Sequence, residues 1–181
     1  MPGSWTHLAA RFFDVLTAQP LRPEERVRLD EWLSPVEQAI FLGQSAADQR
    51  HGLECGIEVA TSYAHRPDLV RAALLHDVGK RHARLGPFGR VLASVLIRLR
   101  IPVGARFRSY EAHGPIGSNE LLELGAERIV VDFARHHHGT RPDSITDDDW
   151  DLLESVDRAR VGAARPSSGY ADPAHGNGRR R

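Results

Sequence analysis

Apolar residues recur at helical spacing along most of this chain, and no stretch alternates apolar and polar residues in the manner of a half-buried strand. Proline and glycine divide the helical pattern into short segments. At 181 residues the chain is long enough for one domain with a sizeable core. The pattern therefore predicts an all-α fold, a compact helical bundle in a single domain.

Capping and stop signals set the expected helix boundaries. Ser34-Pro35-Val36-Glu37 has the spacing of a capping box with proline at the first helical position. Gly52 and Gly56 would let a neighbouring helix approach closely, and Gly79 predicts the end of the helix before it. We expect helices over 5–18, from 23, from 35, over 46–64, 69–77, 88–100, 113–125 and 126–138, and after a cap at Ser144 or Thr146.

Three regions are expected along the chain. Residues 1–44 would form a helical extension that packs on the core, and residues 45–163 would form the functional domain. Residues 164–181 are rich in proline, glycine, serine and arginine, which predicts a disordered tail.

The composition limits the cellular compartments and the binding partners that we expect for this protein. The formal net charge is zero, which gives no electrostatic reason to expect a stable nucleic-acid complex. The single cysteine, Cys55, excludes an internal disulfide and favours a reducing compartment. The chain lacks an apolar stretch of the roughly 18 residues needed to cross a bilayer, and its N-terminus lacks the pattern of a signal peptide. We expect a cytoplasmic protein without a transmembrane segment.

The segment that carries most chemistry is Leu74-Leu75-His76-Asp77-Val78-Gly79-Lys80. The adjacent His76 and Asp77 place an imidazole and a carboxylate at one helix end, where both can bind a metal ion. Lys80 is the only lysine in a chain with 23 arginines. Its compact ammonium suits a point-charge contact to a phosphate oxygen or a metal-bound oxygen.

Further candidates lie on separate predicted helices, each beside an apolar face: His51, His113, His137, His138 and Asp157. Any one of these histidines alone is more often an ordinary core or surface group. Together with His76 and Asp77 they would be stable around a divalent ion, because a buried carboxylate without a partner is costly. Nitrogen and oxygen ligands suit iron, manganese, zinc, nickel or cobalt. Two ions roughly 3.5–4 Å apart could activate a water against a phosphate ester without a protein nucleophile.

In their order along the chain these residues resemble the HD superfamily of metal-dependent phosphohydrolases, over about residues 45–160. His76-Asp77-Val78-Gly79-Lys80 resembles the motif of its HDxGK branch. His113-Gly114-Pro115-Ile116-Gly117 and Arg135-His136-His137-His138-Gly139 resemble its second-metal elements. The resemblance implies one ion held by His51, His76, Asp77 and Asp157, and a second held by Asp77, His113 and either His137 or His138. His137 is favoured, because an Arg-aromatic dipeptide usually precedes the histidine pair.

The resemblance also implies catalytic roles and a substrate class. Asp77 would bridge the ions, Lys80 would steady the substrate phosphate or the bridging hydroxide, and His138 would lie beside the substrate. Gly139-Thr140-Arg141-Pro142 stands where cyclic di-GMP hydrolases of the superfamily carry a Gly-Tyr-Pro signature. Ala47 stands where its three-metal members carry a glutamate. We therefore expect one or two divalent ions and a small phosphorylated substrate, with a nucleotide as one candidate.

Two classes of function stay open at this point. The leading prediction is a phosphomonoesterase or phosphodiesterase that uses a metal-activated water. The alternative is a non-catalytic ligand-binding or signalling module with a structural metal, and an open coordination position would discriminate between them. Arg50 and Arg141 are weaker candidates for binding substrate phosphate. The amphipathic segment 88–103 could cover the substrate, form a homodimer face, lie on a membrane surface or pack on the core.

Overall fold

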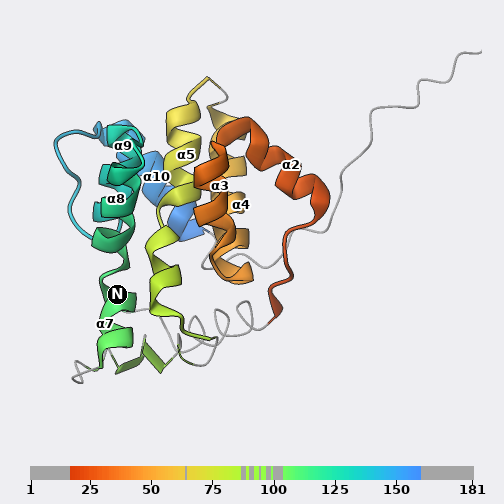
Figure 1. The fold of residues 1–181 in the computed structure, drawn as a ribbon. Helices are drawn as coiled ribbons and strands as arrows, with labels where there is room; N and C mark the ends of the chain where they lie inside the picture. The colour runs from red at the N-terminus through yellow and green to blue at the C-terminus, as the bar shows by residue number, and fades with distance from the viewer. Residues whose placement is uncertain are drawn as a thin grey trace, which may run out of the picture.

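The computed structural model describes residues 17–63, 65–86, 89, 92, 93, 95, 96, 99 and 104–159. Within these residues every regular element is helical and none is a strand, which confirms the predicted all-α fold (Figure 1). The elements are α2 (Pro23–Trp32), α3 (Pro35–Leu42), α4 (Ala46–Ser62), α5 (Pro67–Leu75), the 3-10 helix η1 (Val78–Ala83), α7 (Ala105–Glu111), α8 (His113–Glu123), α9 (Arg128–His136) and α10 (Asp147–Ala159).

The expected helices over 5–18 and 88–100 and the expected tail over 164–181 fall wholly or mostly outside the described residues. Among the helices that the structure does describe, none combines the length and the hydrophobicity needed to cross a membrane.

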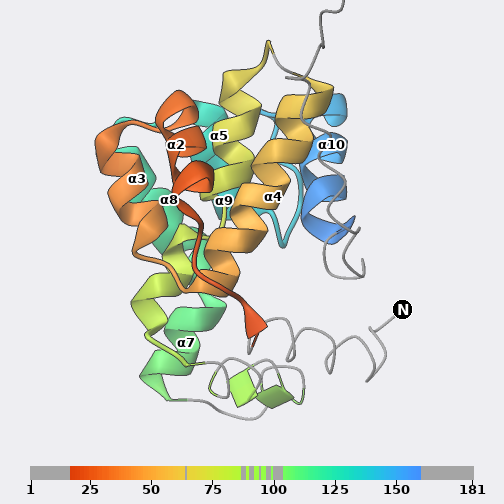
Figure 2. The same cartoon turned by 90° about the vertical axis from the view of Figure 1, so that its right-hand side faces the viewer.

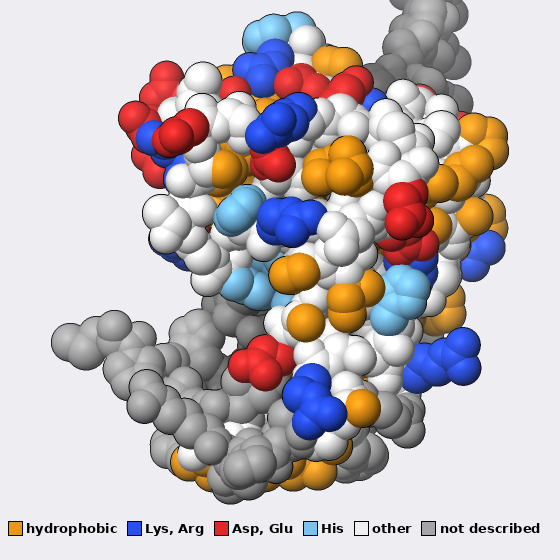
Figure 3. Space-filling view, turned by 60° about the vertical axis from the view of Figure 1, so that its left-hand side comes forward, with side chains coloured by type: hydrophobic (Ala, Val, Ile, Leu, Met, Phe, Trp, Pro, Cys, Tyr) orange, Lys and Arg blue, Asp and Glu red, His pale blue; other side chains and the backbone are white. Residues whose placement is uncertain are grey.

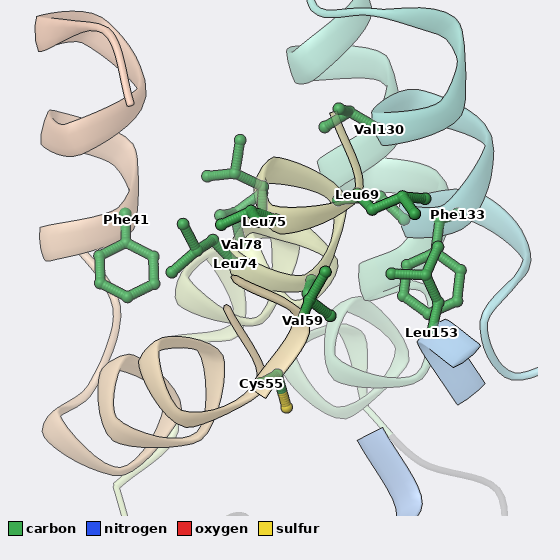
Figure 4. Packing of buried hydrophobic residues seen from close by; sticks show 14 of the residues in the cluster. Phe41, Cys55, Val59, Leu69, Leu74, Leu75, Val78, Val130, Phe133 and Leu153 are labelled. Atoms are coloured by element: carbon green, nitrogen blue, oxygen red, sulfur yellow. The ribbon is translucent and has the colours of Figure 1, made fainter. Parts of the chain in front are cut away.

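Helix α5 lies at the centre of the bundle. It packs against α4 and against α9, and α8 lies beside α9 (Figures 1 and 2). Helix α10 contacts both α4 and α5, while α2 and α3 contact α5 from the N-terminal part of the chain. The interior is apolar, and its largest fully buried side chains include those of Phe41, Leu69, Leu74, Phe133 and Leu153 (Figure 4). This core holds α4, α5, α9 and α10 in fixed relation to one another.

Short capping motifs set several of the helix ends. The capping box at Ser34 is confirmed: its hydroxyl accepts from the backbone N–H of Glu37, and the Glu37 carboxylate accepts from the backbone N–H of Ser34 at 2.9 Å. Helix α8 ends with Gly125 at a φ of 74°, in a Schellman arrangement that glycine adopts without strain. Thr146 caps α10 by accepting from the N–H of Asp149, whereas Ser144 donates to Asp132.

Two expectations about helix boundaries are wrong. Helix α5 ends at Leu75, and Gly79 lies inside η1 and does not terminate the preceding helix. Its lack of a Cβ serves packing here, because the backbone of α8 crosses directly over it. Helix α7 was not expected, since its seven residues are too few for a clear apolar period.

Candidate metal centre

Three histidines lie where helices end, and the same type of hydrogen bond orients each ring. His76 follows α5, His113 lies two residues after α7, and His137 follows α9. In each ring Nδ1–H donates to the carbonyl oxygen three residues earlier, at 2.9, 2.7 and 3.0 Å respectively. The last carbonyl groups of a helix lack intrahelical partners. A helix end therefore supplies the acceptor that fixes each imidazole.

These bonds decide which ring nitrogen remains available. A carbonyl oxygen can only accept, so Nδ1 carries the proton and Nε2 of the neutral ring presents a lone pair. Metal-binding histidines typically donate their other N–H in this way. All three Nε2 atoms face the carboxylate of Asp77: His76 lies 3.4 Å from Oδ2, while His113 and His137 lie 3.2 and 3.4 Å from Oδ1.

The group on the Oδ1 side has the dimensions of a metal site. The Oδ1 atom of Asp77 and the Nε2 atoms of His113 and His137 are separated from one another by 3.2, 3.4 and 3.3 Å. Ligands placed about 2.1 Å from an ion at tetrahedral angles are about 3.4 Å apart. Because the two Nε2 lone pairs face each other, the neutral rings cannot bond across this gap. A cation among the three atoms would satisfy all of them.

A second group lies on the other side of Asp77. The Oδ1 atom of Asp157 is 2.9 Å from Nε2 of His51 and 3.4 Å from Nε2 of His76. Helix α4 supplies His51 and α10 supplies Asp157, although 106 residues separate them in the sequence. His76 in turn faces Oδ2 of Asp77. The two groups therefore meet at the carboxylate of Asp77. Its Oδ1 atom faces the first group and its Oδ2 atom faces the second.

Unpartnered polar atoms test whether these residues fit a metal ion. Nε2 of His76 and Oδ1 of Asp77 are buried and make no hydrogen bond. Such atoms are rare in folded proteins, because each loses its contacts with water without replacement. Both are atoms that a divalent ion of the nitrogen- and oxygen-binding type accepts as ligands. The cluster fits a metal ion and could hold one.

Burial and neighbouring charges shift the pKa values of several side chains in the cluster. Burial alone would raise the pKa of Asp77, but the charges of Lys80 and His76 hold it well below its usual value. Burial would lower the pKa of His76, yet Asp77 and Asp157 raise it to about 10. The two carboxylates thus favour a positive charge beside them at His76. Burial lowers the pKa of His137, which keeps this ring neutral and able to bind an ion.

Lys80 is held between carboxylates. It is only 7% exposed and donates to Oδ2 of Asp77. Burial alone would lower its pKa, but Asp77 and Asp48 raise it, so the ammonium stays charged. Asp48 was not among the predicted site residues. It lies three residues before His51 and therefore on the same side of α4, which is the signal that could have identified it.

One edge of the centre is open to solvent. His138 is exposed, and its ligand atom lies within 4.8 Å of those of Asp77, His113 and His137. The side chain of His51 is 22% exposed, whereas that of Asp77 is 3% exposed. Histidine side chains reach the surface on the side of the molecule that carries α8 and α9 (Figure 3). The structure thus brings both members of the His137–His138 pair to the cluster.

Both arginines considered for substrate binding are engaged elsewhere. Arg50 donates to the backbone carbonyls of residues 19–20 and pairs through two nitrogens with Glu25. Consecutive helical residues point about 100° apart, so Arg50 faces the N-terminal segment while His51 faces the cluster. Arg141 is held by an ion pair and backbone contacts within the loop before α10. The structure does not place either guanidinium in contact with the described ligands.

Comparisons with known proteins identify no relative of this chain. No protein-family model, curated protein or solved structure matches the chain. The resemblance to the HD superfamily therefore rests on the residues and spacings quoted above, and the all-α fold rests on the structure itself.

Proposed function

We propose that this protein is a metal-dependent phosphohydrolase that acts on a small phosphate ester. The observation that carries the proposal is the position of Asp77, which has one oxygen toward His113 and His137 and the other toward His76 and Lys80. A carboxylate with imidazole nitrogens beside each of its oxygens suits a pair of divalent ions. A lysine on the same carboxylate adds a cation for the substrate phosphate.

The protein's own residues would prepare the site for this chemistry. One or two divalent ions bound there would supply a Lewis acid and an activated water. The helix-end hydrogen bonds of the three histidines keep their Nε2 lone pairs directed inward. Lys80 stays protonated and can hold a phosphate oxygen. In the net reaction, water attacks phosphorus, the ester P–O bond breaks, and the alcohol leaves with a proton.

The same geometry bears on the substrate. Substrate would enter at the open edge beside His138, His51 and Asp157, because His76, Asp77, His113 and His137 are buried. This edge would leave a coordination position for water or phosphate, as catalytic metal sites require. A nucleotide is one candidate substrate, and both phosphomonoesters and phosphodiesters fit the chemistry.

A non-catalytic module with a structural metal is the second candidate. The near-complete burial of His76, Asp77 and His137 favours it, since structural sites are closed. The exposed His138 at the edge of the same cluster favours the enzyme.

Two readouts, with added manganese, iron, nickel or cobalt, distinguish the two candidates: release of phosphate from generic monoesters and release of the alcohol from generic diesters. The wild type should hydrolyse at least one of these classes and Asp77→Ala should hydrolyse neither. Asp151→Ala, which removes an exposed carboxylate from α10, is the matched control and should behave as wild type. Metal binding without turnover on any ester would favour the structural module, and equal rates in wild type and Asp77→Ala would overturn the enzymatic proposal.

A further inference from the structure

Glycines lie next to several of the ligands, at points where two helix backbones touch. Gly52 directly follows His51, and a Cβ built on it would lie 2.9 Å from the carbonyl oxygen of Leu74, two residues before His76. The close approach expected at this glycine is confirmed, because α4 and α5 cross here with backbone against backbone. The crossing therefore lies beside one ligand from each helix.

The other half of the centre has two comparable crossings. Gly114 directly follows His113, and its Cβ would lie 3.0 and 3.1 Å from the carbonyl oxygens of Ala134 and Arg135, in the last turn of α9 before His137. A Cβ on Gly117 would lie 2.8 Å from the backbone nitrogen of Gly79, two residues after Asp77. A Cβ on Gly79 would overlap the carbonyl oxygen of His113. Each crossing again joins the elements that carry two ligands.

Backbone contacts of this kind set distances that side chains cannot restore. A side chain that meets a new methyl group can rotate, but a helix backbone has to move as a whole. A metal site tolerates only about 0.2 Å of change in its ligand distances. Separating two helices by several tenths of an ångström would therefore disturb the ligands at that crossing more than those at the other.

We propose that these glycines are positioning residues that set the two halves of the metal centre separately. Gly52 sets the spacing of His51 and His76, whereas Gly114 and Gly117 set the spacing of Asp77, His113 and His137. This inference rests on the metal centre of the proposed function. It goes further, because it assigns the spacing of the ligands in each half to glycines that are not themselves ligands.

The chain offers two matched controls. Gly56 lies one turn after Gly52 and faces the same residue, but its Cβ would meet the side chain of Leu74 at 2.8 and 2.9 Å. Gly56→Ala therefore crowds the same α4–α5 contact against a side chain that can rotate. Gly104 has a φ of −69° and open space around its Cβ position, so Gly104→Ala should be silent.

The experiment uses two backgrounds that each keep one intact half. His113→Gln keeps His51, His76 and Asp157, and His51→Gln keeps the ligands of the other half. Cobalt(II) is titrated into each folded variant and followed by calorimetry and by its visible absorption, whose intensity reports coordination geometry. Melting temperature is measured on the same samples without metal.

Selective loss is the expected result. Gly52→Ala should weaken cobalt binding at least about tenfold in the His113→Gln background and leave it unchanged in the His51→Gln background, the size of effect seen when groups that orient ligands are removed. Gly114→Ala should do the reverse. Gly56→Ala should lower the melting temperature without changing affinity in either background.

Equal weakening in both backgrounds, in proportion to the drop in melting temperature, would show a general packing role and overturn the inference. Unchanged affinity in every folded variant would overturn it as well. If the wild type binds no cobalt, the proposed metal chemistry is overturned, and with it the inference that the glycines set the spacing of metal ligands.

Discussion

Two regions of this molecule bury charged side chains in opposite ways. Where α2 and α3 meet the rest of the bundle, carboxylates pair with arginines: the buried Glu37 pairs with Arg71 at 2.6 Å, and the half-buried Glu25 pairs with Arg50 at 2.8 Å. In the metal centre, carboxylates and imidazole lone pairs face one another, and two of the atoms have no hydrogen bond. Arginine is always charged and supplies the counter-charge itself, although Nε of Arg71 is buried without a hydrogen bond. Neutral histidine leaves an electron pair for a further cation.

The difference separates residues that stabilise the fold from residues that could bind a metal ion. A buried carboxylate that is paired with an arginine has its charge balanced, so replacing it should lower the stability of the fold alone. Replacing a carboxylate that lacks a full set of partners, such as Asp77, should lower metal affinity first. The following changes test that separation, beginning with the largest expected effect.

Asp77→Asn keeps the size of the side chain but removes the charge shared by both ligand groups. We expect the affinity for divalent metal to fall by more than about 100-fold, beyond the loss usual for groups that only orient ligands. Metal analysis after equilibrium dialysis measures this, with Asp151→Asn as the exposed control. Retention of two ions per chain in Asp77→Asn would show that this carboxylate does not bridge the groups.

Glu37→Gln tests the paired region. It removes the shorter of the two ion pairs of Arg71, which is 21% exposed and also pairs with Glu127 at 2.8 Å, and should cost about 2 kcal/mol of unfolding free energy. Metal affinity should stay within about twofold of wild type, since α3 supplies none of the ligands. Urea unfolding and cobalt titration of the same sample measure both quantities. A large loss of affinity would show that the two regions are not separate.

The same carboxylate predicts a pH dependence. Burial would raise the pKa of Glu37, but Arg71 and Ser34 hold it below 4.5 in the folded state. A lowered folded pKa means that the stabilisation is complete above the unfolded value and is lost as pH falls through the folded value. The stability difference between wild type and Glu37→Gln should therefore be constant from pH 7 to about 6 and shrink below about pH 4.5. A difference that grows on acidification would contradict this sign.

Adding metal should stabilise the wild type and leave Asp77→Asn unaffected. An ion that binds only the folded chain at 100 times its dissociation constant contributes about 2.7 kcal/mol. For a domain of this size that corresponds to roughly 5–10 °C in melting temperature. Thermal unfolding after chelation and after readdition of manganese or cobalt checks the expectation. An equal shift in Asp77→Asn would place the stabilising ion elsewhere.

Much of this arrangement follows from local sequence signals. The capping box at Ser34, the start of α5 at Pro67 and the glycine end of α8 were all readable, because each depends on neighbouring residues. The list of candidate ligands was readable too, since imidazoles beside apolar faces stand out. The orientation of the rings could have been predicted from the same pattern, given that His76 and His137 each follow a helix.

Longer-range features were not readable in this way. Gly79 has the usual sequence context of a helix terminator, yet its function depends on a backbone crossing with Gly117, 38 residues later. Helical spacing places Asp48 on the same side of α4 as His51, but its interaction with Lys80 depends on the tertiary fold. The partners of Arg50 lie 25 to 31 residues away in sequence. None of these partners follows from periodicity, because tertiary packing chooses them.

Arg50 gives the smallest and most discriminating test, because it is adjacent in sequence to His51 yet belongs to the paired region. Arg50→Lys cannot reproduce the two-nitrogen contact with Glu25, and should cost about 1 kcal/mol of stability because the pair is partly exposed. The Michaelis constant for any ester that the wild type hydrolyses should not change. A rise of tenfold or more in that constant, with stability unaltered, would mean that Arg50 leaves Glu25 to bind substrate phosphate. Arg50 would then belong to the paired region in the free protein and to the substrate site when substrate is bound.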